Sequence, residues 1–115
     1  NVDRLRASLV VQGANIPVTE AAEERLHDRG VVNIPDFIAN AGGVVCAAME
    51  YRGATESQVF DRVEETVRRN TRMVLERAVG EACPPRDVAM DLAEERVREA
   101  MSHRRWSLQS GRRRT

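Results

Sequence analysis

The chain has 115 residues and a formal net charge of zero, with 42% hydrophobic and 31% charged residues. This length and balance are typical of one globular domain, and they exclude a disordered chain. No apolar run approaches the roughly 18–20 residues that a membrane helix needs, so we expect no membrane span. The chain begins at Asn1 with no initiator methionine and no signal-peptide pattern, which favours a cut end and a cytoplasmic location.

Arginine provides all 18 basic residues, and the chain contains no lysine. Because arginine stays protonated, no side chain here can form a Schiff base or act as an amine base. Residues 1–103 contain 13 arginines against 18 acidic residues, whereas residues 104–115 contain five arginines and no acid. This basic tail has no recognition motif, so we expect no specific nucleic-acid binding. Cys46 and Cys83 fit no metal-ligand or redox spacing, which predicts two free thiols and no metal site.

The first part of the chain predicts a strand, a helix and a second strand. Two β-branched apolar runs, residues 9–13 and 31–34, have the length of strands that are buried on both faces of a parallel sheet. Between them, Thr19 is a good N-cap for a helix over residues 20–28, which Gly30 ends. Such a βαβ unit is nearly always right-handed, with its two strands parallel.

A glycine-containing loop and a short helix are predicted next. Residues 36–43 form the loop, and its last two residues are both glycine. The small apolar residues that follow, 44–49, predict a helix that ends near Gly53.

A long helix is predicted from a capping box in which Thr55 is the N-cap and Gln58 stands three residues later. Its apolar residues keep helical spacing to about Ala82. Acidic and basic residues four positions apart predict ion pairs on its solvent face, Glu64 with Arg68 and Glu65 with Arg69.

Pro84 and Pro85 end that helix, and Asp87 is expected to cap a last helix that runs to residue 103. The basic residues 104–115 are almost free of apolar side chains, and we expect them to be disordered. Two strands are too few for a stable sheet of their own. The fold class is therefore α/β, as the end of a larger domain.

Two segments carry candidate chemistry, and each directly follows a predicted strand. They are Gly13-Ala14-Asn15 and Asn40-Ala41-Gly42-Gly43. Ligands of open α/β sheets bind at the carboxyl ends of the strands, and glycine there lets the backbone approach them closely. An asparagine amide can match a carboxamide donor for acceptor. Asn15 and Asn40 are thus candidates for binding a nicotinamide amide or a ribose hydroxyl; alternatively, they only cap turns, and the paired glycines only permit a tight bend.

Both segments also resemble signatures of the glutamate/leucine/phenylalanine/valine dehydrogenase family. Residues 12–22 read Gln-Gly-Ala-Asn-x-Pro-x-Thr-x-x-Ala, and residues 35–44 read Pro-Asp-Phe-Ile-Ala-Asn-Ala-Gly-Gly-Val, followed by Glu50. Residues 93–101 resemble the family's last helix only loosely. The resemblance implies a Rossmann-like dinucleotide-binding domain and NAD(P)-dependent oxidative deamination of an L-amino acid to a 2-oxo acid and ammonia.

The resemblance also implies roles for individual residues. Asn15 and Asn40 would lie beside the nicotinamide ribose and carboxamide of NAD or NADP. The crevice around them would be lined by Gly13, Ala14, Gly42 and Gly43.

Three departures from the family pattern bear on activity. The family's substrate-domain lysines, one of them a catalytic base, have no counterpart, and no Gly-x-Gly-x-x-Gly phosphate loop is present. Glutamate-specific members usually carry serine at the position of Ala47, where it helps to hold the distal carboxylate of the substrate. Branched-chain-specific members carry an apolar residue there, so Ala47 is a candidate substrate-binding residue that disfavours glutamate.

These observations predict the C-terminal fragment of an NAD(P)-dependent amino-acid dehydrogenase that is inactive alone and forms a homo-oligomer. Residues 1–53 would be the βαβ end of the dinucleotide-binding domain, residues 54–103 the C-terminal helices and residues 104–115 the tail. The alternative is a stand-alone interaction or regulatory module derived from such an enzyme. The sequence encoded upstream of Asn1 would distinguish the two hypotheses.

Overall fold

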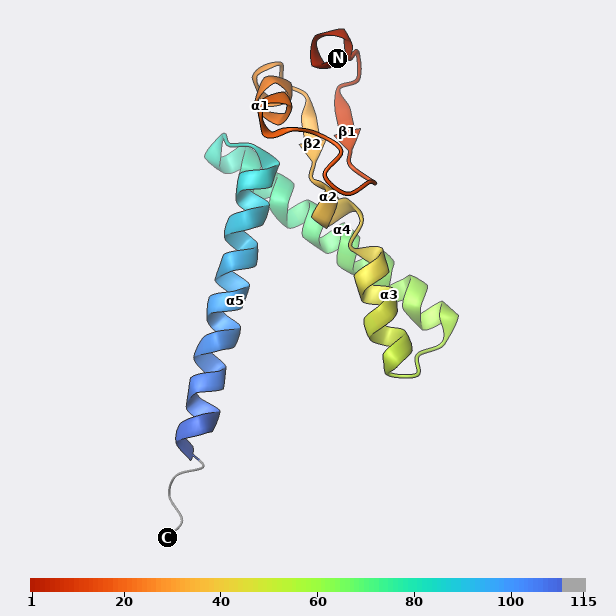
Figure 1. The fold of residues 1–115 in the computed structure, drawn as a ribbon, viewed down its shortest axis with the longest axis vertical. Coiled ribbons are helices and arrows are strands. Elements are labelled where there is room, and N and C mark those ends of the chain that lie inside the picture. The colour runs from red at the N-terminus through yellow and green to blue at the C-terminus, as the bar shows by residue number, and fades with distance from the viewer. Residues whose placement is uncertain (111–115) are drawn as a thin grey trace.

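The computed structural model describes residues 1–110, with side chains for residues 1–102. Two short strands and a set of helices form an elongated molecule of 69 × 34 × 23 Å, and the last helix, which contributes much of this length, projects from the rest (Figure 1). Within the described residues, no helix is long and apolar enough to cross a bilayer. In chain order the elements are the 3₁₀ turn η1 (Val2–Arg4), β1 (Leu9–Val11), α1 (Glu20–Asp28), β2 (Val32–Ile34), α2 (Asp36–Ala39), α3 (Gly42–Tyr51), α4 (Glu56–Glu81) and α5 (Pro85–Ser110).

The predicted βαβ unit is confirmed: β1 and β2 are parallel, and α1 connects them. Leu9 pairs with Val32, and Val11 pairs with Ile34. The expectation that both strands are buried on both faces is wrong for this chain. Leu9, Val11 and Val32 are 53%, 59% and 41% exposed, and only Ile34 on that face is covered. The reason is that Ile34 alone reaches the side chains of α4 and α5.

The capping signals of α1 and α4 act as predicted. Thr19 Oγ1 accepts the Ala22 N–H at the start of α1. At the start of α4, the Thr55 N–H donates to Gln58 Oε1 at 2.9 Å, and the Gln58 N–H donates to Thr55 Oγ1 at 3.4 Å. Both expected ion pairs along α4 are formed, Glu64–Arg68 at 2.6 Å and Glu65–Arg69 at 3.8 Å.

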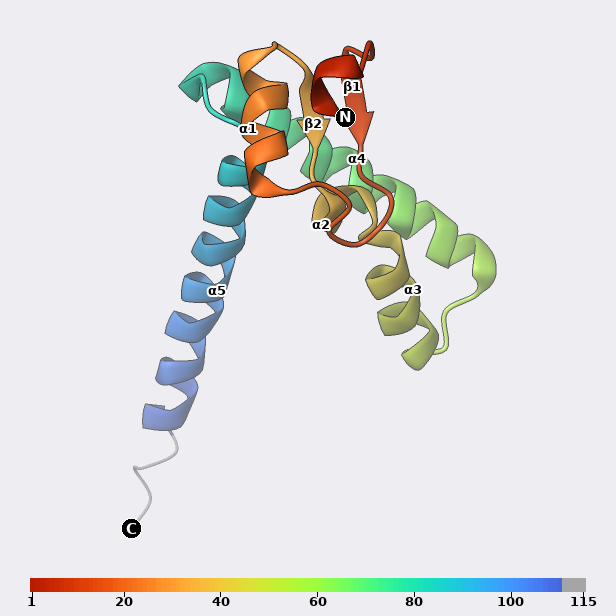
Figure 2. The ribbon, with the colours of Figure 1, turned by 45° about the horizontal axis from the view of Figure 1, so that its top comes forward.

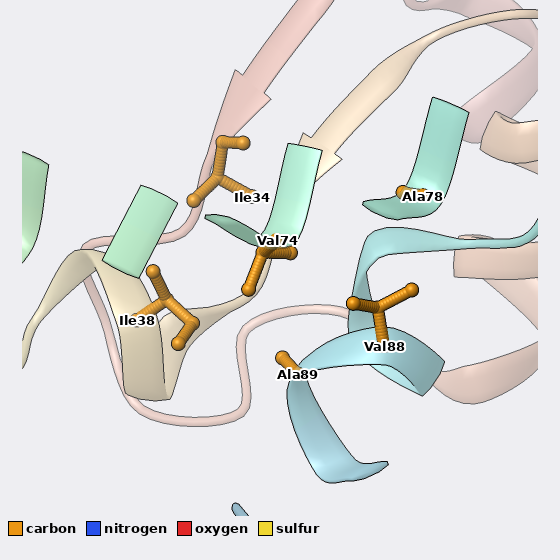
Figure 3. Close-up of a cluster of buried hydrophobic side chains, with 6 residues drawn as sticks. All are labelled: Ile34, Ile38, Val74, Ala78, Val88 and Ala89. Carbon is orange, nitrogen blue, oxygen red and sulfur yellow. The ribbon is translucent and has the colours of Figure 1, made fainter. Parts of the chain in front are cut away.

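One cluster of buried apolar side chains joins β2, α2, α4 and α5 (Figure 3). The α2 turn therefore rests on the two long helices, and this contact fixes the segment that carries Asn40. The members of the cluster are Ile34, Ile38, Val74, Ala78, Val88 and Ala89.

The segment expected to be a loop over residues 36–43 is mostly helical. Asp36–Ala39 form the single turn α2, and α3 begins at Gly42 rather than at Val44. Pro35 caps α2 with extended backbone, and the acidic Asp36 in the first turn complements the helix dipole. The paired glycines are thus the first residues of a helix, so the alternative interpretation, in which they only permit a tight bend, does not describe them.

The last helix starts earlier and extends further than predicted. It begins at Pro85, because proline at the first helical position loses no hydrogen bond, and Asp87 lies in its first turn rather than at the cap. No glycine or proline follows before Gly111, and α5 continues to Ser110, away from the body (Figures 1 and 2). Residues 104–110, which were expected to belong to a disordered tail, are thus part of α5 in this structure, while residues 111–115 lie outside the described part of the chain.

Candidate functional site

The two predicted asparagines meet at the carboxyl edge of the sheet. Asn40 Nδ2 donates a hydrogen bond to Asn15 Oδ1 at 2.9 Å. Asn15 lies in the loop after β1, and Asn40 ends α2, which follows β2 directly. The sequence predicts that each asparagine follows the carboxyl end of a parallel strand, and parallel strands place these ends at the same edge of the sheet, which brings the two side chains together. The bond uses one donor and one acceptor, and among the described side chains Asn15 Nδ2 and Asn40 Oδ1 make no further hydrogen bond.

The loop that carries Asn15 is held by the carboxylate of Asp36. The backbone N–H of Ile16 donates to Asp36 Oδ2 at 2.9 Å. Ile16 has a φ of 46°, which is rare for a β-branched residue. The backbone carbonyl of the same Asp36 accepts the N–H of Asn40 at 2.7 Å. One residue therefore contacts the chain beside both asparagines.

Behind this loop lies a network of buried polar side chains. Gln12 Nε2 donates to Glu23 Oε1 at 2.7 Å and to Asn33 Oδ1 at 3.0 Å. Arg86, from the first turn of α5, donates to Glu23, to Gln12 Oε1 at 3.3 Å and to Asp36 Oδ1 at 3.1 Å. Within the described side chains, no buried polar atom lacks a partner. The network connects β1, α1, β2, α2 and α5.

Sequence reasoning missed the role of this network. Gln12 and Asn33 interrupt apolar runs that were expected to be buried, and buried polar side chains require hydrogen-bond partners. These two polar residues could therefore have indicated a buried hydrogen-bond network beside β1 and β2. No comparable signal pointed to Arg86, which is separated from Gln12 by 74 positions.

The network favours the ionised forms of Asp36 and Arg86. The N–H of Ile16 is the strongest influence that lowers the pKa of Asp36; burial opposes it, and Arg86 adds to the lowering. The hydrogen bond to Glu23 raises the pKa of Arg86, and the contact with Asp36 acts in the same direction. Arg86 also lies over the Phe37 ring, 5.4 Å from its centroid. At neutral pH Asp36 is deprotonated and Arg86 is protonated. This ion pair therefore binds and orients neighbouring groups, and neither of its members is available to transfer a proton.

The three candidate glycines differ in their surroundings. A Cβ on Gly13 or Gly43 would meet no atom within 4 Å, so the protein leaves open space beside both. A Cβ on Gly42 would lie 3.1 Å from Cγ1 of Val63 on α4. Gly42 is therefore also a packing residue between α3 and α4. Ala14 is exposed in the same loop as Gly13.

A groove of about 530 Å³ runs between α3 and α4, and Gly42, Gly43, Cys46 and Glu50 contribute to its lining. Ala47 is exposed on α3 and does not line this groove. Burial and the neighbouring Glu50 raise the pKa of the Cys46 thiol, so Cys46 is protonated at neutral pH.

Cys46 and Cys83 are both free thiols, as predicted. Among the side chains that the structure describes, no group of three or more His, Cys, Asp or Glu residues is placed to hold a metal ion. Burial also raises the pKa of Cys83, with nearby acidic residues adding to the shift. Neither thiol has the lowered pKa of an activated nucleophile.

The chain is similar to one family over nearly its whole length. Residues 1–105 match the model of the Glutamate/Leucine/Phenylalanine/Valine dehydrogenase family. An NADP(+)-dependent glutamate dehydrogenase of Pyrobaculum calidifontis is 39% identical over 92% of this chain, and a glutamate dehydrogenase of Aeropyrum pernix is 35% identical over 92%. Glutamate dehydrogenase B of Halobacterium salinarum is 51% identical over 44% of the chain. The chain spans only 27% and 28% of the first two relatives.

Proposed function

The chain belongs to the glutamate/leucine/phenylalanine/valine dehydrogenase family, and from this premise we propose that it is the C-terminal segment of an NAD(P)-dependent amino-acid dehydrogenase. It would contribute the nicotinamide side of the cofactor crevice and be inactive alone. The short share of each relative that it spans supports this proposal. The exposed apolar face of its two strands does so too, because a parallel sheet is normally covered on both faces.

The Asn15–Asn40 pair is the observation that carries the proposal. After their mutual hydrogen bond, the pair retains an amide donor and an amide acceptor at the carboxyl edge of the sheet. These two groups complement a carboxamide or a ribose hydroxyl. The open space beside Gly13 and Gly43 allows a ligand to approach the backbone there. These residues fit the nicotinamide half of the cofactor, whereas this chain carries no glycine-rich loop for its phosphates.

In the complete enzyme, NAD or NADP supplies the hydride acceptor. The residues of this chain bind and orient it. They supply no amine base, because the chain has no lysine. The Asp36 carboxylate beside the asparagine pair is held by Arg86, and both cysteines are held as thiols. We therefore propose that a residue outside this chain deprotonates the amino-acid substrate.

The substrate class is an L-amino acid, and Ala47 bears on which one. The relatives named above are glutamate dehydrogenases. The methyl group of Ala47 cannot donate a hydrogen bond to a distal carboxylate, and an unpaired buried charge is costly. We therefore propose that the enzyme accepts aliphatic amino acids alongside glutamate.

The first test uses the purified chain alone. NAD(P)H formation is followed by absorbance with a panel of L-amino acids, and we expect no turnover above background. Turnover by the chain alone would overturn the proposal, since the residues needed for proton transfer and phosphate binding would then have to lie within it.

The second test restores the missing parts. The corresponding segment of the Pyrobaculum calidifontis enzyme, which is 39% identical, is replaced by this chain, and NADP-linked amino-acid oxidation is measured. We expect an active chimera in which Asn40→Ala raises the KM for NADP by at least about tenfold.

The matched control for the chimera is Asn70→Ala. Asn70 lies on α4 and accepts a hydrogen bond from Arg96, far along the chain from the asparagine pair. It should leave the KM for NADP unchanged. An inactive but folded chimera, or equal effects of the two substitutions, would instead favour the stand-alone module.

A further inference from the structure

Ile16 occupies a backbone conformation that its own side chain does not explain. Its φ is 46°, in a backbone region that is sparsely populated and strained for a β-branched residue. The side chain is 83% exposed, so burial of apolar surface does not offset this cost. This backbone conformation points the Ile16 N–H toward the carboxylate of Asp36, with an N···O distance of 2.9 Å.

Asp36 is itself fixed in place. Asp36 is only 7% exposed. Its Oδ1 accepts a hydrogen bond from Arg86 at 3.1 Å, and its Oδ2 accepts the hydrogen bond from the Ile16 N–H. Arg86 is held in turn by Glu23 and by Gln12. The carboxylate therefore has a fixed position against which the loop can be ordered. A hydrogen bond to a charged, partly desolvated acceptor is also stronger than one to a neutral group.

The hydrogen bond between Asp36 and Ile16 affects the positions of both asparagines. Asn15 immediately precedes Ile16 in the loop, and the N–H of Asn40 donates to the carbonyl of Asp36 at 2.7 Å. If the Asp36–Ile16 bond is lost, the loop is free to relax toward negative φ, and the side chain of Asn15 turns away from Asn40.

We propose that Asp36 is the positioning residue of the Asn15–Asn40 pair, and that Arg86 holds Asp36 in place from α5. The first turn of α5 is thereby connected to the candidate nicotinamide site. The consequence for cofactor binding rests on the proposed function, whereas the positioning itself is a property of this chain.

The test is NMR of the 115-residue chain and its variants. The readouts are hydrogen exchange at the Ile16 amide and the side-chain amide resonances of Asn15 and Asn40. Asp36→Ala should speed Ile16 exchange by at least about tenfold and shift both asparagine resonances. Asp36→Asn keeps one of the two acceptor oxygens, without the charge, and should speed Ile16 exchange by less than Asp36→Ala does. The Val74 amide, in the buried part of α4, is the control for folding.

A second background separates positioning from general stability. Glycine adopts positive φ without help, so in Ile16→Gly the loop no longer depends on Asp36. Adding Asp36→Ala to this variant should leave the asparagine resonances nearly unchanged. Equal shifts in both backgrounds would overturn the proposal, and so would loss of Val74 protection in both, because Asp36 would then be needed only for folding.

The cofactor arm uses the chimera with the Pyrobaculum enzyme. Asp36→Ala should raise the KM for NADP by about tenfold, and Ile16→Gly should restore much of the loss. An inactive chimera would count against the proposed function, while the NMR comparison would still decide the positioning role. The two failures are therefore distinguishable.

Discussion

A side-chain carbon on Gly42 would lie 3.1 Å from Cγ1 of Val63, whereas the same atom on the adjacent Gly43 would meet nothing within 4 Å. Neighbouring glycines at the start of α3 thus face different surroundings. Gly42 lets α3 pack against α4, and Gly43 leaves space beside the candidate cofactor crevice. This contrast provides a matched pair of substitutions.

Gly43→Ala should stabilise the protein by up to about 1 kcal/mol, because alanine lowers the conformational entropy of the unfolded chain and favours a helix. Gly42→Ala gains the same term but forces Val63 to shift, and should be less stable than Gly43→Ala by about 1 kcal/mol. Urea denaturation midpoints of the two variants measure the difference. Equal stabilities of the two variants would mean that α3 and α4 move apart around the added methyl group without a cost in free energy.

Stability should fall at acidic pH through Asp36. The pKa of this carboxyl lies below its ordinary value of 3.8 in the folded protein, chiefly because the Ile16 N–H donates to it. The ionised form is therefore favoured by folding. Its contribution is fully present above about pH 4 and is lost as the pH falls through the lowered folded pKa. Urea midpoints measured from pH 2 to pH 6 should drop more steeply for the native chain than for Asp36→Asn, and parallel curves would contradict this assignment.

Substrate preference should depend on Ala47. In the chimera we expect kcat/KM for leucine and valine to rise relative to glutamate, compared with the unmodified Pyrobaculum enzyme. Ala47→Ser restores a hydroxyl donor and should move the ratio back toward glutamate by about tenfold. A chimera that keeps a strong glutamate preference would show that other residues hold the distal carboxylate.

The isolated chain should self-associate through its uncovered strands. Leu9, Val11 and Val32 are at least 41% exposed, and contiguous apolar patches of this kind usually mark contact surfaces. A stable pairing would bury more than about 1,000 Å² in total. Light scattering after size-exclusion chromatography should give a mass above the 12.9 kDa of one chain.

Two variants locate this contact. Val11→Glu places a charge on the exposed sheet face and should shift the chain toward the monomer. Tyr51→Glu changes a 94% exposed residue at the end of α3 and should leave the mass unchanged. A native chain that is monomeric with cooperative unfolding would contradict the prediction and strengthen the case for an independent module.

Features that depend on residues near one another in the chain could be predicted from the sequence. The capping box of Thr55 and Gln58 and the N-cap of Thr19 were predictable because each involves contacts within one helical turn. The meeting of Asn15 and Asn40 was predictable for another local reason. Each asparagine closely follows its strand, and parallel strands end at one edge of the sheet.

The surroundings of the Asn15–Asn40 pair depend on contacts between distant parts of the chain. Arg86 meets Gln12, Glu23 and Asp36 across 74, 63 and 50 positions, and no local pattern specifies such contacts. The exposure of the Leu9 and Val11 side chains likewise could not be predicted from the sequence. An apolar run predicts a strand that can be buried, but burial requires another part of the protein to cover it, and the residues described here do not cover these two.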